Sequence, residues 1–137
     1  MSIRVEVCAR DKNTVIAEVI AGQTYRVSAE GCWIDWRIRT DARGFQSPFY
    51  LKPFERFRRL PEANWFALVG FIAPKSLASR GQLSPPDVAL FDMSLYVDDA
   101  SRWTCPGSGC LHVFANDVST AYRNNKGSIV LSFVNDG

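Results

Sequence analysis

The feature that most constrains the fold is a series of short segments in which apolar and polar residues alternate. Alternation of this kind puts apolar side chains on one face of a β-strand and polar side chains on the other. Glycine-containing breaks and other turn residues separate the segments, as expected between strands. The alternating segments are residues 3–7, 14–20, 24–29, 32–38, 111–115 and 128–134.

Residues 66–72 are apolar throughout, and their Val, Phe and Ile content favours a buried strand. Across the chain, no window of a dozen residues sustains the period of an amphipathic helix. We therefore predict an all-β protein, a β-sandwich of the galactose-binding-domain-like jelly-roll type. A length of 137 residues fits one domain spanning 1–137.

Composition supports a packed domain and disfavours two classes of partner. Hydrophobic residues make up 47% of the chain and charged residues 22%, as in ordinary globular proteins. The net charge of +2 is too small for a protein built to grip a phosphate backbone. The run 54–59 alternates aromatic and basic residues, but such runs are more typical of an interface than of a nucleic-acid surface. We therefore expect no nucleic-acid partner. We also expect no membrane insertion, because the longest apolar run, 65–72, is too short to cross a bilayer.

The amino-terminal segment and the cysteines bear on cellular location. The first residues lack the charged, then apolar, then small pattern of a secretory signal. We therefore expect synthesis in the cytoplasm, with any release to the exterior following a non-classical route. Cys105 and Cys110 flank a Pro-Gly-Ser-Gly turn, which is compatible with either a disulfide or two free thiols. A zinc site using these thiols and His112 would lack a clear fourth ligand.

The segment 116–127 carries the richest set of oxygen ligands. Within it lie one carboxylate, on Asp117, and the amide oxygens of Asn116, Asn124 and Asn125. Calcium accepts six to eight oxygens from carboxylates, amides and main-chain carbonyls in flexible geometry. The same residue types also form ordinary turns, because Asn, Asp and Gly tolerate left-handed backbone conformations. The segment alone is therefore compatible with a calcium loop or with a simple turn.

Three elements in order resemble the calcium-dependent galactophilic lectin family typified by LecA (PA-IL) of Pseudomonas. The family has a G-x-W-like element, then an apolar Ala-Leu-Val strand, and then an N-D-x4-Y-x-N-N-x-G segment. The matching residues here are Gly31 to Trp33, 67–72, Asn116-Asp117, Tyr122, Asn124-Asn125 and Gly127. The resemblance spans about residues 19–134 and is most specific in the last third.

This resemblance implies a bacterial-type lectin with one calcium ion as cofactor. Side-chain oxygens of Asp117, Asn124 and Asn125 would bind the metal, together with the main-chain carbonyls of Trp36 and Ala121. Two neighbouring hydroxyls of a galactose-containing or related glycan would complete the coordination. The sugar would then contact Asp117, Asn124, Trp36 and Ala121. We also expect a homo-oligomer, since multivalency strengthens weak single sites.

The chain departs from the family in its second sugar-contacting loop. The family carries a His-Pro motif there, and the corresponding segment 45–59 has none. The alternative function is a β-sandwich protein-interaction module with a degenerate or absent site, using residues 45–59. An enzyme is not expected, because the only histidine, His112, has no nucleophile motif beside it and reads as a sheet residue. Trp33 and Trp65 are expected in the core, and Trp103 on the surface.

Overall fold

The computed structural model describes residues 2–74, 76–77, 82–98 and 102–136. In these ranges the regular structure consists of strands and short 3-10 helices. Short alternating segments cannot bury a helical stripe, so they pair as strands instead. The elements are β1 (Ser2–Cys8), β2 (Thr14–Val19), β3 (Thr24–Glu30), β4 (Trp33–Asp35), β5 (Ile38–Thr40), η1 (Lys52–Phe57), β6 (Leu68–Ala73), β7 (Phe91–Asp92), η2 (Met93–Tyr96), β8 (Arg102–Thr104), β9 (Gly109–Ala115), η3 (Tyr122–Asn124) and β10 (Asn125–Asn135).

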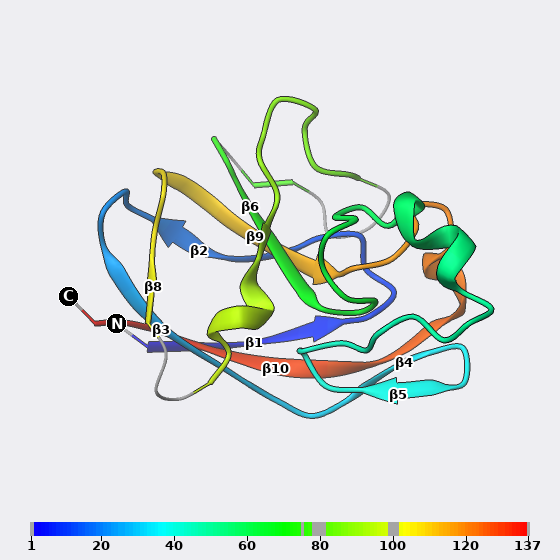
Figure 1. The fold of residues 1–137 in the computed structure, drawn as a ribbon. Coiled ribbons are helices and arrows are strands. Elements are labelled where there is room, and N and C mark those ends of the chain that lie inside the picture. Colours follow the sequence, from blue (N-terminus) through cyan, green and yellow to red (C-terminus); the bar gives the residue numbers. More distant parts are fainter. Residues whose placement is uncertain (1, 75, 78–81, 99–101, 137) are drawn as a thin grey trace.

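The strands form two antiparallel sheets that stack as a sandwich (Figure 1). The first sheet has the order β5-β4-β10-β3-β8, with β1 paired to the other edge of β10. The second sheet has the order β2-β9-β6-β7. The last strand, β10, organises the first sheet, because its first residues pair with β4 and its later ones with β3. The predicted all-β, two-sheet class is therefore confirmed.

The main core lies between the two sheets. It receives inward-facing side chains from both, among them Val27 and Leu131 of the first sheet and Leu68 and Val113 of the second. Tyr25 stacks on Phe133, with ring centroids 4.6 Å apart. Trp33 is fully buried and meets Phe66 edge-on, as expected of a core tryptophan. This packing anchors β4, whose last residue lines the candidate site.

A second apolar cluster covers the outer face of the second sheet. Val69, Phe71 and Ala73 of β6 point into it, while Leu68 points into the main core. Loop residues Leu60 and Ala63 close it from outside. Burial on both faces explains why this strand is apolar at every position rather than alternating. Among the described residues, no helix is both long enough and apolar enough to span a membrane.

Two sequence predictions about single elements were wrong. The segment 32–38 is not one strand but the β4–β5 hairpin, since the chain turns at Trp36 and Arg37. Trp103 is not a surface residue: only 4% of it is exposed. It sits on β8, stacks on Phe91 at 5.5 Å and packs near Tyr25. A three-residue strand at a sheet edge gives too short an alternation to reveal that its central residue faces the core.

The buried thiols and the histidine make contacts within the fold. Cys105 and Cys110 form no disulfide, and the Cys105 thiol donates a hydrogen bond to the Gly107 carbonyl at 2.8 Å. His112 lies on β9, in a strand as predicted; it is fully buried there and stacks on Phe71 at 4.8 Å. Its Nε2 accepts from the Leu77 N–H at 3.1 Å, and its Nδ1 lies 3.0 Å from the Cys110 carbonyl. Burial lowers the pKa of His112, so a neutral ring fits both contacts.

Candidate ion and ligand site

Three segments that are distant in sequence meet at one end of the sandwich. They are the β4–β5 hairpin, the segment that contains η1 and the segment that contains η3 (Figure 1). The two termini lie at the other end of the molecule. Between the three segments is an open pocket of about 320 Å³. Its lining residues are Asp35, Trp36, Ile38, Tyr50, Leu51, Phe54, Trp65, Asp117, Val118, Ala121 and Asn124.

The structure brings the sequence-predicted ligand residues together. Trp36, Asp117, Ala121 and Asn124 all line the pocket. Asn125 does not line it but follows Asn124 directly, as the buried first residue of β10. Residues separated by more than eighty positions in the chain thus converge on one pocket. Their convergence is a structural observation, whereas their role as ligands remains a prediction.

Asp117 is a buried carboxylate at the base of the pocket. Only 3% of the residue is exposed. Its Oδ1 accepts a hydrogen bond from the Val118 N–H at 2.7 Å, but Oδ2 is buried and has no hydrogen-bond partner among the described residues. Burial, and secondly the charge of Asp35, raise the pKa of Asp117 to about 7. The Val118 N–H and the neighbouring Asn125 amide oppose this shift.

Asn125 offers a second buried side-chain oxygen that accepts no hydrogen bond from the described residues. Its Nδ2 donates to the Ala9 carbonyl at 3.1 Å, which fixes the orientation of the amide. Its Oδ1 is buried and has no hydrogen-bond partner in the described part of the chain. A buried acceptor without a partner costs about 1–3 kcal/mol. The Asp117 and Asn125 side chains are neighbours in the fold, and two such oxygens fit a cation that would bind both.

Asp35 is the site residue that the sequence analysis missed. It lines the pocket, and its half-buried carboxyl has its pKa raised by burial. In the antiparallel register of β4 and β10, Asp35 lies directly opposite Asn125. The alternation of β4 indicates only that Asp35, two residues from the buried Trp33, shares its face; its position opposite Asn125 comes from strand pairing.

Trp36 occupies a strained turn at the rim of the pocket. It follows Asp35 in the two-residue turn between β4 and β5 and has a φ of 55°. A bulky side chain at positive φ is rare and costs roughly 1–3 kcal/mol. The side chain is 56% exposed, and the Arg37 guanidinium lies 4.5 Å from the centroid of its ring. The turn therefore presents an exposed aromatic ring at the pocket.

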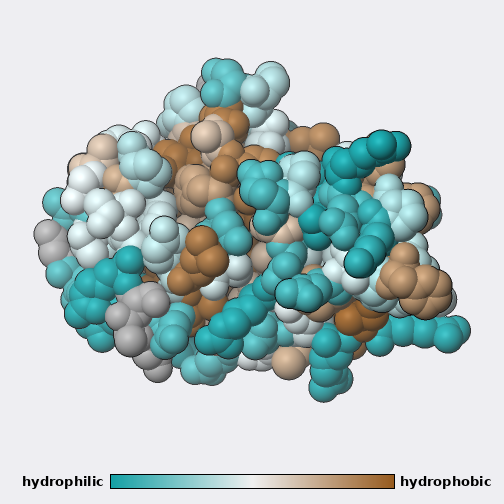
Figure 2. Space-filling model, viewed as in Figure 1, coloured by the Kyte–Doolittle hydropathy of each residue, from teal (hydrophilic) through white to brown (hydrophobic). Residues whose placement is uncertain are grey.

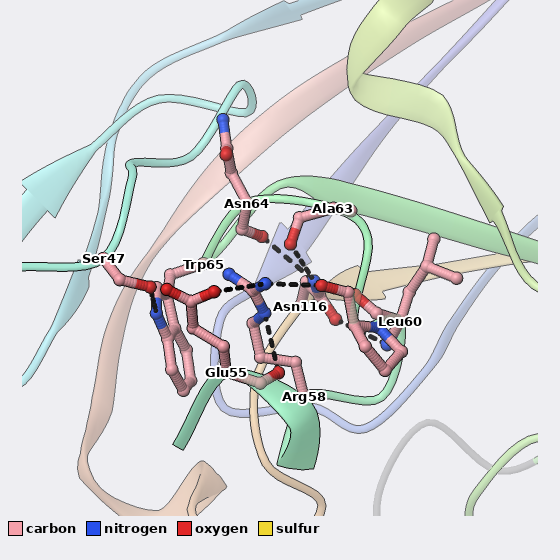
Figure 3. Close-up of polar contacts among 9 residues, drawn as sticks. Ser47, Glu55, Arg58, Leu60, Ala63, Asn64, Trp65 and Asn116 are labelled. Atoms are coloured by element: carbon pink, nitrogen blue, oxygen red, sulfur yellow. Dashed lines mark hydrogen bonds and ion pairs between the residues drawn. The ribbon is translucent and has the colours of Figure 1, made fainter. Parts of the chain in front are cut away.

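Asn116 holds the loop behind the pocket rather than facing it. Its Nδ2 donates to the carbonyls of Leu60, Ala63 and Asn64 at 2.9, 3.1 and 3.0 Å (Figure 3). Its Oδ1 accepts from the Leu60 N–H at 3.0 Å. The amide is therefore fully occupied and fully buried. Asn116 was predicted only as one of several nearby amide oxygens, and the structure gives it this clamping role instead.

The two arginines that end the run 54–59 turn inward. Arg58 is buried, donates to the carbonyls of Glu55 and Pro61 and lies over the Trp65 ring (Figure 3). Arg59 lies over the ring of Phe114 at 3.4 Å and donates to the Tyr122 hydroxyl at 3.2 Å. These contacts fix the loop against the second sheet. The same two guanidinium groups are therefore engaged in packing rather than displayed as a basic surface.

Aromatic and aliphatic side chains also line the pocket. Tyr50, Leu51 and Phe54 come from the segment containing η1, the segment where the sequence departs from the lectin family. Tyr50 is 47% exposed and Phe54 51%. Figure 2 shows apolar surface at this end of the molecule, bordered by hydrophilic atoms. The pocket thus combines an oxygen-rich side with an apolar side. We refer to Trp36, Tyr50, Leu51 and Phe54 as the apolar wall.

Within the described ranges, no three His, Cys, Asp or Glu side chains form a metal-binding group. The predicted set differs in kind from such a group, because Asp117 is its only carboxylate. Amide and main-chain oxygens make up the remainder, and calcium accepts both. The fit of this site to a cation therefore rests on the buried oxygens of Asp117 and Asn125.

No protein-family profile matches this sequence, and no curated protein sequence matches it. A solved structure is similar: the "EclA N-terminal domain; PllA-like lectin", with a TM-score of 0.57. The match covers 97% of this chain and 95% of that one. This chain therefore has the same fold as that lectin domain. At 15% identity, the likeness establishes the fold and leaves the ligand of this chain to the chemistry of its own pocket.

Proposed function

We propose that this protein is a calcium-dependent carbohydrate-binding lectin of galactoside type. The observation that carries the proposal is the pair of buried oxygens, Asp117 Oδ2 and Asn125 Oδ1, that have no hydrogen-bond partner among the described residues. A bound cation would relieve the cost of leaving both oxygens without partners. Calcium suits this donor set because it accepts carboxylate, amide and carbonyl oxygens.

The remaining ligands are assigned by their location in the same pocket. Asn124 would add a side-chain oxygen, and Trp36 and Ala121 would add main-chain carbonyls. These donors together with Asp117 and Asn125 leave positions open on an ion that takes six to eight oxygens. When bound, the ion would supply a direct attachment point for two neighbouring hydroxyls of a sugar. Asp117 and Asn124 would accept hydrogen bonds from the same hydroxyls.

The apolar wall supports a sugar as the ligand. A pyranose has a face of C–H groups that packs well against an aromatic ring. Trp36, Tyr50 and Phe54 offer such rings beside the oxygen-rich side of the pocket. A ligand with hydroxyls on one side and C–H groups on the other would match both walls. The similar fold of a PllA-like lectin domain adds support from an independent direction.

A protein-interaction module remains the second candidate, and one observation favours it. Phe49, Phe54 and Phe57 are 86%, 51% and 51% exposed in the segment that contains η1. Exposed aromatic groups of this size often mark interaction surfaces. In a lectin that assembles as a homo-oligomer, the same residues could instead meet a second copy. Sedimentation analysis with Phe49→Ser and Phe57→Ser variants distinguishes a self-interface from a surface for other proteins.

The proposal is tested by calorimetric titration of calcium, followed by a glycan array with and without a chelator. We expect calcium binding and calcium-dependent retention of galactose-containing glycans. The Asp117→Ala variant should lose both. Absence of calcium binding in the parent, or glycan binding that persists in the chelator, would falsify the proposal. If the protein binds only glycans that lack galactose, it is a lectin but its specificity is not for galactosides.

A further inference from the structure

The site has a second carboxylate, and three observations locate it. Asp35 and Asp117 line the same pocket. The register of β4 and β10 puts Asp35 opposite Asn125, and residues directly opposite in an antiparallel pair have Cβ atoms about 4.5–5.5 Å apart. The charge of Asp35 also acts on Asp117, so the two carboxylates are electrostatic neighbours. Asp35 therefore belongs to the same constellation as the predicted ligands.

In the part of the chain that the structure describes, no Lys or Arg side chain forms an ion pair with Asp35 or Asp117. The Arg37 guanidinium lies over the Trp36 ring. Arg58 pairs with Glu55, with an N–O distance of 3.8 Å, and Arg59 lies over Phe114. Two like charges held together away from water are unfavourable unless an opposite charge is bound between them. The arrangement thus favours a cation supplied from solution.

We propose that Asp35 supplies a second carboxylate to the cation site, so that the ion is held between Asp35 and Asp117. This inference rests on the proposed function and deepens it. The affinity of calcium sites depends on the number of charged ligands. With two carboxylates, the charge of a divalent ion is balanced by the protein alone. The site then binds the ion tightly before any sugar arrives, and a trivalent lanthanide becomes a strong competitor.

The Asp35→Asn variant tests the inference on the folded protein without any sugar. Terbium is the probe, since its emission is excited by energy transfer from nearby tryptophans, and Trp36 and Trp65 line the pocket. Calcium affinity is then read from competition against terbium. We expect the variant to bind calcium at least about tenfold more weakly. We also expect its metal-free form to melt at a higher temperature, since a desolvated like charge has been removed.

Two further variants serve as controls. Asp87→Asn removes the same charge from an exposed position on a different loop and should bind calcium as the parent does. Asp35→Glu keeps the charge and should retain most of the affinity. The paired result, weaker metal binding with a more stable metal-free protein, is one that a structural role for Asp35 would not produce. Loss of affinity accompanied by a lower melting temperature therefore overturns the inference.

The outcomes separate this inference from the proposed function. If the parent binds calcium and the Asp35→Asn variant binds it equally well, Asp35 is not a ligand and the lectin proposal stands. If the parent binds neither calcium nor terbium, the proposed function fails and this inference fails with it. If Asp35→Asn binds weakly, its metal-free form melts at a higher temperature and Asp35→Glu binds as the parent does, the second carboxylate is established.

Discussion

Asp35 and Asn125 lie directly opposite each other where β4 pairs with β10. This one register position joins the first third of the chain to the last and fixes the geometry of the pocket. A shift of the register by one residue would turn Asp35 to the other face of the sheet, because side chains alternate along a strand. The fully buried Trp33, two residues earlier on the same face, anchors that register. The site is thus held by the core of the sandwich.

Replacement of Asp117 by Asn should separate metal binding from folding. The change removes a buried charge while keeping the shape of the side chain. We expect calcium binding to be lost and the metal-free protein to become more stable at pH 8. Chemical denaturation and calcium titration measure the two effects. The exposed Asp87→Asn should alter neither, and a less stable Asp117→Asn protein would show that the carboxylate is structural.

The metal-free protein should lose stability as the pH rises from about 4 to about 7. The pKa of Asp117 is about 7 in the folded state, and its ordinary value is 3.8. The folded state therefore holds this proton more tightly than the unfolded state, and the stabilisation from protonation disappears as the pH passes through the folded pKa. Over this pH interval the free energy of unfolding should fall by at most about 4 kcal/mol. Equilibrium denaturation in a chelator, at several pH values, measures it.

Calcium should reverse this pH dependence, because a bound cation stabilises the ionised carboxylate. We expect stability in saturating calcium to rise, rather than fall, between the same pH limits. In the Asp117→Asn variant both the fall in chelator and the rise in calcium should shrink. Parallel curves with and without calcium in the parent would contradict an ion at Asp117.

Removal of the Asn116 side chain should destabilise the protein strongly. The amide satisfies three main-chain carbonyls and one N–H of the loop 60–64 from a fully buried position. Truncation leaves the buried Leu60 N–H and the Ala63 carbonyl without this partner, while the Leu60 and Asn64 carbonyls keep only their main-chain donors. We therefore expect Asn116→Ala to lower the free energy of unfolding by roughly 2–4 kcal/mol. Asn64→Ala is the matched control, since its side chain is exposed and only its carbonyl accepts the bond. Equal effects of the two substitutions would contradict the clamping role.

Trp36 should affect sugar binding more than calcium binding. Its proposed metal ligand is the main-chain carbonyl, which Trp36→Ala preserves, whereas its exposed ring is lost. We expect calcium affinity to stay close to that of the parent and sugar affinity to fall about tenfold. Calorimetry with each ligand in turn measures both. If calcium affinity falls as much as sugar affinity, the Trp36 ring holds the turn in place and its role is not specific to the sugar.

The sequence predicted the elements whose patterns are local. Alternation in 3–7 and 128–134 predicted β1 and β10, and the apolar 66–72 overlaps the strand that is buried on both faces. The segment 116–127 led to the pocket because its oxygen-bearing residues are neighbours in the chain. Each of these features is visible within a short window.

The features that escaped prediction depend on pairing between distant residues. Asp35 becomes a site residue only when β4 pairs with β10, and Asn116 finds its partners in a loop more than fifty positions earlier. Trp103 lies in a strand of three residues, and its burial comes from contacts with Tyr25 and Phe91. No local pattern encodes such contacts, since they arise from the pairing of distant strands within a sheet and from the stacking of the two sheets.

Titration of a galactoside into the protein, first in calcium and then in excess chelator, tests directly whether an ion holds the sugar. We expect measurable binding in calcium, its complete loss in the chelator and its recovery when calcium is restored. The Asp117→Asn variant should bind no galactoside under either condition. Galactoside binding of equal strength with and without calcium would contradict the central claim that the sugar is held through an ion in this pocket.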